Sequence, residues 1–169
     1  MPKAIIVCGT PGSGKTTHAR QLAATSDAIL LDIDTVTERL VKVGLAAAGH
    51  SPDDRDSDYF KHTYREPIYQ ALFDIARDNL AFHDVVITGP FTKEIQDTDW
   101  PVKLSVELDC QLEVHYVRCP PEIRRHRLSV RGNDRDRAKL QDWDRYIKYY
   151  GDEQPPVFEH VLVDSGPAS

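Results

Sequence analysis

The amino-acid sequence predicts a three-layer α/β/α sandwich built around a five-stranded parallel sheet. Two observations indicate this fold class. Short apolar runs typical of buried strands alternate along the chain with stretches of helical periodicity. Strands that alternate with helices pair in parallel through right-handed crossovers, which places helices on both faces of the sheet. The 169 residues are enough for one core, so we expect a single domain over residues 1–169.

Five apolar runs are the expected strands, and helices are expected between them. The runs cover residues 4–8, 28–31, 85–88, 112–117 and 161–163. Helical spacing predicts a first helix over residues 15–24 and three later apolar stripes. The stripes consist of Val36, Leu40, Val43 and Ala47, then Ile68, Leu72 and Ile75, then Leu140, Trp143, Ile147 and Tyr150, the last closed by Gly151.

Residues 101–109 fit two different structures. Every second residue from Val102 to Leu108 is apolar, which is the period of a strand. A crossover between the third and fourth strands needs a helix, however, and Pro101 is a favourable first helical residue. We therefore expect a helix in this segment.

The loop after the first expected strand fits the pattern G-x-x-x-x-G-K-[ST] at every fixed position. It lies between a strand and a helix, where this pattern binds the phosphates of a nucleoside triphosphate. Its glycines let backbone N–H groups point at phosphate oxygens, and the helix N-terminus adds a positive dipole end. We expect ATP as the ligand, with Lys15 reaching the β- and γ-phosphates and Thr16 ligating Mg²⁺. The candidate ATP-binding residues of this loop are Gly9, Thr10, Pro11, Gly12, Ser13, Gly14, Lys15, Thr16 and Thr17.

Two aspartates end the second expected strand. The C-terminal end of a strand that neighbours the first one lies near the γ-phosphate, where a carboxylate can accept the proton of an acceptor hydroxyl. Asp34 is the expected general base, and it is also placed to cap the helix that follows. Asp32 is expected in the substrate site, either as the base, through Mg²⁺-bound water, or in hydrogen bonds at the strand end.

An arginine-rich segment over residues 121–137 follows the fourth expected strand. Arg124, Arg127 and Arg131 are three and four residues apart, so they share one helical face. Guanidinium groups stabilise the charge that spreads over the γ-phosphoryl oxygens during transfer, and Gly132 interrupts the helix as a hinged lid requires. We expect a lid in which Arg127 and Arg131 are catalytic and Arg124 and Arg127 contact the nucleotide. An exposed basic helix is the alternative.

The acceptor side of the site carries weaker signals. Thr88 and Gly89 end the third strand, where many phosphate-loop ATPases carry an aspartate that holds Mg²⁺ through water, and this argues against a motor or switch protein. Gly89 begins either a simple turn or a loop at the acceptor site. Arg39 and Arg65 lie in the region expected to cover the acceptor, and together with Asp32 and Thr88 they are the candidate substrate-binding residues.

Bulk composition narrows the class of protein. No apolar run approaches the roughly 20 residues of a membrane span, and Met1 leads almost directly into the first strand, so we expect neither a span nor a signal peptide. The three cysteines lie in or beside apolar segments, which is typical of reduced thiols in a cytoplasmic protein. The net charge of −6 argues against a long nucleic-acid partner, and the seven histidines show no metal-ligand pattern.

On these motifs the chain resembles small phosphate-loop kinases, the group that contains polynucleotide 5′-kinase domains, zeta toxins and chloramphenicol phosphotransferase. The resemblance covers most of the chain and rests on the phosphate loop, the aspartate pattern that begins at Asp34, and the arginine-rich lid. It implies Lys15 and Thr16 on phosphate and Mg²⁺, Asp34 as the base, and lid arginines on the triphosphate. Polynucleotide kinases carry an arginine shortly after the base that helps to bind the acceptor phosphate. Thr37 occupies that position here, which argues against a nucleic-acid acceptor.

The sequence therefore predicts a phosphotransferase that moves the γ-phosphate of Mg-ATP to a hydroxyl of a small molecule. The alternatives are a 5′-hydroxyl polynucleotide kinase and a non-kinase, nucleotide-binding regulatory ATPase. No motif specifies the acceptor or the oligomeric state.

Overall fold

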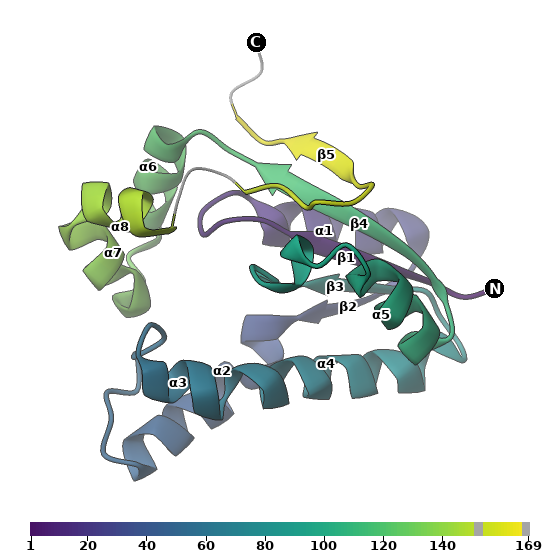
Figure 1. Ribbon diagram of the computed structural model, residues 1–169, viewed down its shortest axis with the longest axis horizontal. Helices are drawn as coiled ribbons and strands as arrows, with labels where there is room; N and C mark the ends of the chain where they lie inside the picture. The colour runs from purple at the N-terminus through teal and green to yellow at the C-terminus, as the bar shows by residue number, and fades with distance from the viewer. Residues whose placement is uncertain (151–153, 167–169) are drawn as a thin grey trace.

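The computed structural model describes residues 1–150 and 154–166, and its centre is a sheet of five parallel strands in the order β2-β3-β1-β4-β5 (Figure 1). All four pairings are parallel, as expected from strands that alternate with helices. The strands are β1 (Lys3–Cys8), β2 (Ile29–Asp32), β3 (Val85–Thr88), β4 (Gln111–Arg118) and β5 (Val161–Asp164). Each expected apolar run is a strand in the structure.

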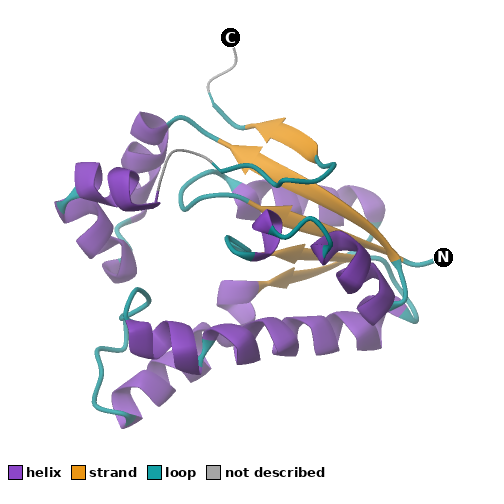
Figure 2. Cartoon of the chain, in the orientation of Figure 1, coloured by secondary structure: helices purple, strands orange, loops and turns teal. Residues whose placement is uncertain are grey.

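Helices cover both faces of the sheet, so the predicted three-layer sandwich is confirmed (Figure 2). One face packs against α1, and the other packs against α4 and α5. The α-helices are α1 (Lys15–Ser26), α2 (Ile33–Ala47), α3 (Asp58–Thr63), α4 (Arg65–Leu80), α5 (Trp100–Leu108), α6 (Pro121–Arg131), α7 (Arg137–Gln141) and α8 (Trp143–Tyr150). Two 3₁₀ turns, η1 (Glu94–Gln96) and η2 (Asp134–Asp136), complete the elements.

Strand alternation divides the core into two clusters. On β1, Ile5 and Val7 face Ala19 and Ala23 of α1, whereas the intervening residues face the cluster built by α4 and α5. Both faces of the central strands are buried, which explains why these strands read as continuous apolar runs. All three cysteines are buried, as expected.

Helix α5 confirms the expectation for the ambiguous segment. Its buried side chains include Leu104 and Leu108, one helical turn apart, whereas Val102 and Val106 are 68% and 76% exposed. The alternating apolar residues therefore belong to two sides of the helix, and only the side with the two leucines is buried.

The expected apolar stripe of α2 is wrong. Leu40 and Val43 are 76% and 69% exposed, and the buried face carries Thr37, Val41 and Leu45 instead. Thr37 and Val41 each follow an expected position by one residue, or about 100° around the helix, because α2 packs on Ile68 of α4. Val36 of the expected stripe is partly buried against the core. The periodicity correctly predicted a helix, but a different face of this helix packs against the rest of the protein.

The other two stripes are partly correct. Ile68 and Leu72 are buried, but Ile75 is 36% exposed at the rim of α4. The last stripe is divided between α7 and α8, and Leu140 and Ile147 pack on a small cluster around Trp143. Its expected end at Gly151 lies outside the described residues.

Helices α6, η2, α7 and α8 form an arginine-rich helical segment over residues 121–150, beside the C-terminal ends of the strands (Figure 1). It has its own apolar cluster, in which Leu128 of α6 packs against Trp143 and Tyr146 of α8. Among the residues that the structure describes, no helix has the length and apolar character needed to cross a membrane.

Candidate active site

The strand order brings the phosphate loop and the two predicted aspartates to one edge of the sheet. Strand β1 leads into the phosphate loop, and β2 ends at Asp32. The expectation that β2 neighbours β1 is wrong, because β3 lies between them and Asp32 is in register with Thr88. Because β3 ends in Thr88, a small side chain, the carboxylate of Asp32 on β2 can reach across the end of β3 to Thr16.

The phosphate loop has a backbone that only glycines adopt readily. Gly9, Gly12 and Gly14 have positive φ angles, which L side chains rarely adopt. At Gly9 an added Cβ would lie 2.4 Å from the carbonyl oxygen of Val117, because the loop passes against β4. No side chain caps the N-terminus of α1, and the free N–H groups of such a helix end bind anions.

Lys15 lies under this loop, where its Nζ donates to the carbonyl oxygen of Thr10 at 2.8 Å. Burial lowers the pKa of Lys15 to about 8, and the charges of Arg131 and Arg135 lower it as well. The negative charge of Asp34 acts in the opposite direction. An anion bound beside Lys15 would therefore raise this pKa, and any neutral lysine would take up a proton when the anion binds.

A cavity of about 520 Å³ opens between the phosphate loop, α1, α6 and the end of β5. Its phosphate-loop side is lined by Gly12, Gly14, Lys15, Thr16 and Thr17. Arg127 and Arg131 line the side that α6 contributes. This volume lies within the range of small-molecule sites.

Arg127 is held at the rim of this cavity by the loop itself. Its guanidinium donates to the carbonyl oxygens of Gly12 at 3.4 Å and Ser13 at 3.3 Å. It also donates to the carbonyl oxygen of Ser165, after β5, at 2.7 Å. The arginine thus ties α6 to both walls of the cavity.

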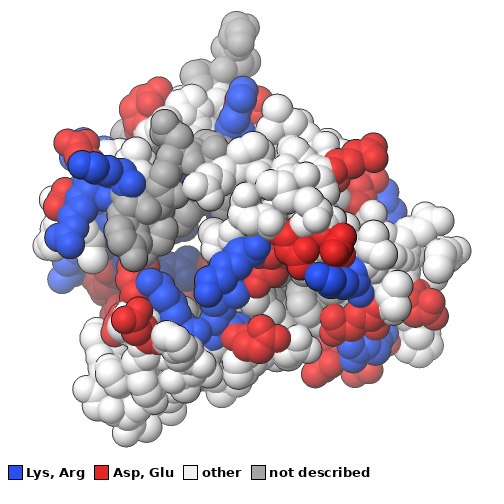
Figure 3. Space-filling view, in the orientation of Figure 1, with Lys and Arg blue, Asp and Glu red and all other residues white. Residues whose placement is uncertain are grey.

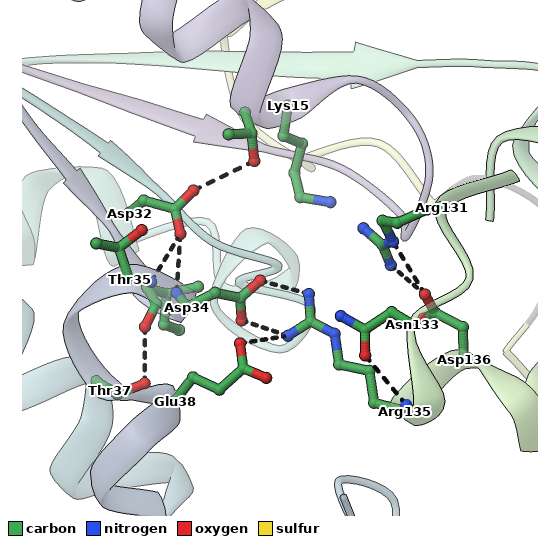
Figure 4. Close-up of polar contacts among 12 residues, drawn as sticks. Lys15, Asp32, Asp34, Thr35, Thr37, Glu38, Arg131, Asn133, Arg135 and Asp136 are labelled. Carbon is green, nitrogen blue, oxygen red and sulfur yellow. Dashed lines mark hydrogen bonds and ion pairs between the residues drawn. The ribbon is translucent and has the colours of Figure 1, made fainter.

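Thr16 and Asp32 form the pair expected at a magnesium site. The Thr16 hydroxyl donates to Oδ2 of Asp32 at 3.2 Å (Figure 4). Hydroxyl and carboxylate oxygens suit Mg²⁺, which keeps several waters and takes few protein ligands. The described residues contain no group of three or more His, Cys, Asp or Glu that could hold a metal by themselves, so phosphate and water would complete the shell.

Asp32, not Asp34, caps α2. Oδ1 of Asp32 accepts hydrogen bonds from the backbone N–H groups of Asp34 at 2.9 Å and Thr35 at 3.1 Å. This cap fixes the first turn of the helix and leaves the Asp34 side chain directed at the site. Of the two roles considered for Asp34, capping therefore belongs to its neighbour.

The side chain of Asp34 is bound by Arg135 of η2. The two guanidinium nitrogens of Arg135 donate to Oδ1 and Oδ2 of Asp34 at 2.7 and 2.6 Å, and Glu38 lies 3.8 Å from the same arginine (Figure 4). Burial by itself would raise the pKa of Asp34, but the hydrogen bonds and charge of Arg135, aided by Lys15 and Arg55, hold it below the usual range. Arg135 lies within the predicted arginine-rich segment 121–137 but was not among the candidate site residues, because Gly132 ends the helical face of α6 before it.

The three arginines predicted to share one face of α6 have different environments. Arg131 binds the buried carboxylate of Asp136 at 3.0 and 2.5 Å and still lines the cavity. Arg124, expected to contact the nucleotide, is instead only 1% exposed. Its Nε donates to the carbonyl oxygen of Cys119 at 3.1 Å, and its guanidinium lies 5.9 Å from the ring centre of Trp143. It lies on the inner side of α6, where it packs the helix onto α8.

The predicted acceptor residues are spread over a wider region. Thr88 is buried at the end of β3, and Arg39 is exposed on α2. Arg65 forms a bidentate ion pair with Glu94 at 2.8 and 2.7 Å and lies over the ring of Tyr69. This ion pair links α4 to η1, and it uses both terminal nitrogens of the Arg65 guanidinium.

His18, which its position in the first helix suggested would be exposed and not catalytic, is a further residue of this site. It lines the nucleotide cavity, and its Nε2 lies 2.9 Å from Nδ1 of His115, whose Nε2 contacts Glu113 at 2.5 Å. His18 is partly buried, because one side of its ring packs on β4.

Comparisons with known proteins identify the family and the fold. Residues 5–153 match the family AAA_33, described as an AAA domain. None of the curated proteins with which the sequence was compared matches it.

Several solved structures share the fold. A putative kinase from Chloroflexus aurantiacus J-10-fl has a TM-score of 0.66 and 19% identity, and the match covers 98% of this chain and 85% of that one. A sugar kinase from Janibacter sp. HTCC2649 has a TM-score of 0.60 and 17% identity, with 97% and 86% covered. A gluconokinase from Sinorhizobium meliloti 1021 has a TM-score of 0.54 and 16% identity, with 99% and 84% covered. The chain therefore belongs to the AAA_33 family of AAA domains, and its fold is that of the P-loop kinases.

Proposed function

We propose that the protein is an ATP-dependent phosphotransferase with Asp34 as the general base and a hydroxyl of a small molecule as the acceptor. The observation that carries the proposal is the position of the Asp34 carboxylate. It lies in the first turn of α2, at the same sheet edge as Lys15 and the Thr16–Asp32 pair, and on the open side of the phosphate loop. A nucleotide-binding switch has no need for a carboxylate there.

In this mechanism the acceptor oxygen attacks the γ-phosphorus while the bond to the β–γ bridging oxygen breaks, and ADP leaves. Asp34 takes the hydroxyl proton. Lys15, Arg127 and Arg131 bind the phosphate oxygens, on which negative charge is spread during transfer. Thr16 and Asp32 would hold Mg²⁺, which when bound neutralises charge on the β- and γ-oxygens.

One buried side chain favours a small acceptor over a nucleic acid. The solved structures with this fold include a sugar kinase and a gluconokinase but also the Pnkp1/Rnl/Hen1 RNA repair complex, so the comparisons do not separate the two acceptor classes. Thr37, at the position of the acceptor-binding arginine of polynucleotide kinases, is buried, and its hydroxyl donates to the carbonyl oxygen of Ile33 at 2.7 Å. It therefore faces α2 itself and not an acceptor.

The variant Asp34→Asn tests the proposal. We expect it to lower kcat about 10²- to 10⁴-fold with any accepted alcohol, while Mg-ATP still binds, because only the proton acceptor is removed. The acceptor comes from a screen of ADP release with Mg-ATP and alcohols, sugars, nucleosides, aminoglycosides and oligonucleotides, with products identified by mass spectrometry. Full turnover by Asp34→Asn would overturn the assignment of the base. Labelled oligonucleotides as the only products would establish the polynucleotide kinase instead, and nucleotide-dependent partner binding without any phosphorylated product would favour a regulatory ATPase.

A further inference from the structure

The carboxylate proposed as the base is neutralised in this structure. Arg135 holds both oxygens of Asp34 in a bidentate ion pair, the strongest geometry available to an arginine and a carboxylate. A base held in this way has little affinity for a proton. The step that activates Asp34 must therefore give Arg135 another partner.

A second arginine, Arg55, lies near the start of α2, because it stacks on Phe60, and Phe60 shares an apolar cluster with Ile33, the residue before Asp34. Arg55, in the loop before α3, is partly buried, and its guanidinium lies 5.2 Å from the ring centre of Phe60. Its Nε is buried and has no hydrogen-bond acceptor among the residues that the structure describes. Asp34, Glu38 and Arg135 are all near enough to shift the pKa of Arg55.

The positively charged side chains around Asp34 fall into two groups, one for the phosphoryl donor, ATP, and one for the phosphoryl acceptor. Lys15 and Arg131 line the nucleotide cavity, whereas Arg135 is not among its lining residues and has its guanidinium against the Asp34 carboxylate (Figure 4). Lys and Arg side chains gather around the hollow between the arginine-rich helical segment and helices α2 to α4 (Figure 3). When ATP is bound to Lys15 and Arg131, Arg55 and Arg135 remain available to bind the phosphoryl acceptor.

We propose that the phosphoryl acceptor carries an anionic group, a carboxylate or a phosphate, which binds Arg55 and Arg135 and thereby releases Asp34 to act as the base. The inference rests on the proposed phosphotransferase function and specifies its substrate class. The exchange conserves charge, because the oxyanion replaces Asp34 on Arg135 and the freed carboxylate receives the hydroxyl proton. A neutral alcohol cannot make this exchange, so it leaves the base neutralised.

The geometry also limits the distance between the two groups of the acceptor. The oxyanion takes the place that Asp34 holds on Arg135, while the hydroxyl must reach the same aspartate. The hydroxyl and the anionic group are therefore only a few bonds apart, as in a hydroxy acid or a sugar phosphate.

Matched pairs of acceptors test the inference. Glycerate and glycerol, gluconate and glucitol, and a nucleoside 3′-monophosphate and its nucleoside differ chiefly in the anionic group, and the pairs separate carboxylates from phosphates. With Mg-ATP we expect phosphorylation of anionic members and little or none of their neutral partners. Arg55→Gln and Arg135→Gln should raise KM for an accepted anion about 10- to 100-fold, because each removes charged hydrogen bonds to it. Arg125→Gln, which removes an exposed arginine of α6, is the control and should leave KM unchanged.

A binding measurement decides the inference even if no member of the panel is phosphorylated. Inorganic phosphate is titrated calorimetrically into protein saturated with the magnesium complex of a non-hydrolysable β,γ-imido ATP analogue. We expect both arginine variants, checked for folding by circular dichroism, to weaken phosphate binding at least about tenfold relative to Arg125→Gln. Unchanged phosphate binding in both variants would overturn the inference, as would equal phosphorylation of neutral and anionic members, which leaves the phosphotransferase intact. Arginine-dependent phosphate binding without any phosphorylated alcohol would instead remove the phosphotransferase and keep the anion site.

Discussion

Arg135 and Asp34 are 101 residues apart in the chain and share two hydrogen bonds of 2.7 and 2.6 Å. One side chain comes from the arginine-rich helical segment and the other from the first turn of α2. The pair therefore joins the segment that covers the nucleotide cavity to the element that carries the proposed base. Because Arg135 lowers the pKa of Asp34, the proton affinity of the proposed base depends on the position of this segment.

The first prediction concerns the pH dependence of stability. The pKa of Asp34 is lower in the folded protein than in the unfolded chain, so its contribution is present above the ordinary aspartate pKa of about 3.9 and is lost as the pH falls through the folded value. Because the Asp34 side chain is 45% exposed, we expect Asp34→Asn to cost only about 0.5–1 kcal/mol at pH 7.

Urea denaturation at pH 7 and near pH 3 measures this difference. The control is Asp74→Asn, which breaks an exposed pair with Arg77 on α4 and should cost less than about 0.5 kcal/mol. A difference between wild type and Asp34→Asn that does not shrink at low pH would contradict the prediction.

The second prediction is proton uptake when nucleotide binds. With a pKa of about 8, roughly half of the Lys15 side chains are neutral at pH 8 in the nucleotide-free protein. Phosphate oxygens beside Lys15 favour its charged form, so binding of Mg-ATP should raise this pKa and take up about half a proton at pH 8, and almost none at pH 6.5.

Calorimetry in buffers of different ionisation enthalpy measures the uptake directly. The affinity for Mg-ATP should also fall as the pH rises above 8, because the free protein then loses the proton that the complex needs. Lys15→Met should abolish the uptake at pH 8. Equal uptake by wild type and Lys15→Met would assign the proton to another group.

Much of the fold could be predicted from the sequence, because strand pattern and helix order depend on local spacing. The phosphate loop is equally local, since its glycines and the Lys-Thr pair are adjacent in the chain. The outcome was different wherever a side chain's role depends on packing between distant elements. The buried face of α2 was misplaced because Ile68, 23 positions after Leu45, decides which side is covered.

The arginines show the same limit. Helical spacing groups Arg124 with Arg127 and Arg131, but the packing of α8 on α6 buries Arg124 against Trp143. Arg135 is four residues after Arg131, but Gly132 ends α6 before it, and yet Arg135 lies beside the proposed base. Arg135 and Asp34 come together only because the chain after β4 folds back towards α2. No local sequence pattern predicts this tertiary contact.

The third prediction tests the two edges of α5. Leu104 is 1% exposed in the core cluster, whereas Val102, two residues earlier, is 68% exposed. Leu104→Ala should therefore lower the free energy of unfolding by about 2–5 kcal/mol through lost burial and a cavity. Val102→Ala should change it by less than about 0.5 kcal/mol, because alanine removes an exposed side chain and favours the helix. Similar losses in urea denaturation for both variants would indicate that the segment behaves as a strand in solution.

The fourth prediction concerns the close approach of the phosphate loop to β4. Gly9 has a φ of +144°, and a Cβ there would lie 2.4 Å from the carbonyl oxygen of Val117, which is part of the backbone and cannot rotate away. Gly9→Ala should therefore destabilise the protein by about 3 kcal/mol or more and displace the loop, so that Mg-ATP affinity is lost as well.

Gly49 provides the matched control for Gly9. It also has a positive φ, of +79°, but an added Cβ would have no neighbour within 4 Å. Gly49→Ala then carries only the backbone strain of about 1–2 kcal/mol and should keep full affinity for Mg-ATP, because it lies after α2, away from the loop. Urea denaturation and calorimetric titration of both variants separate steric contact from φ strain. If the two alanines cost the same and nucleotide still binds to Gly9→Ala, the contact between the phosphate loop and β4 is not what requires glycine at this position.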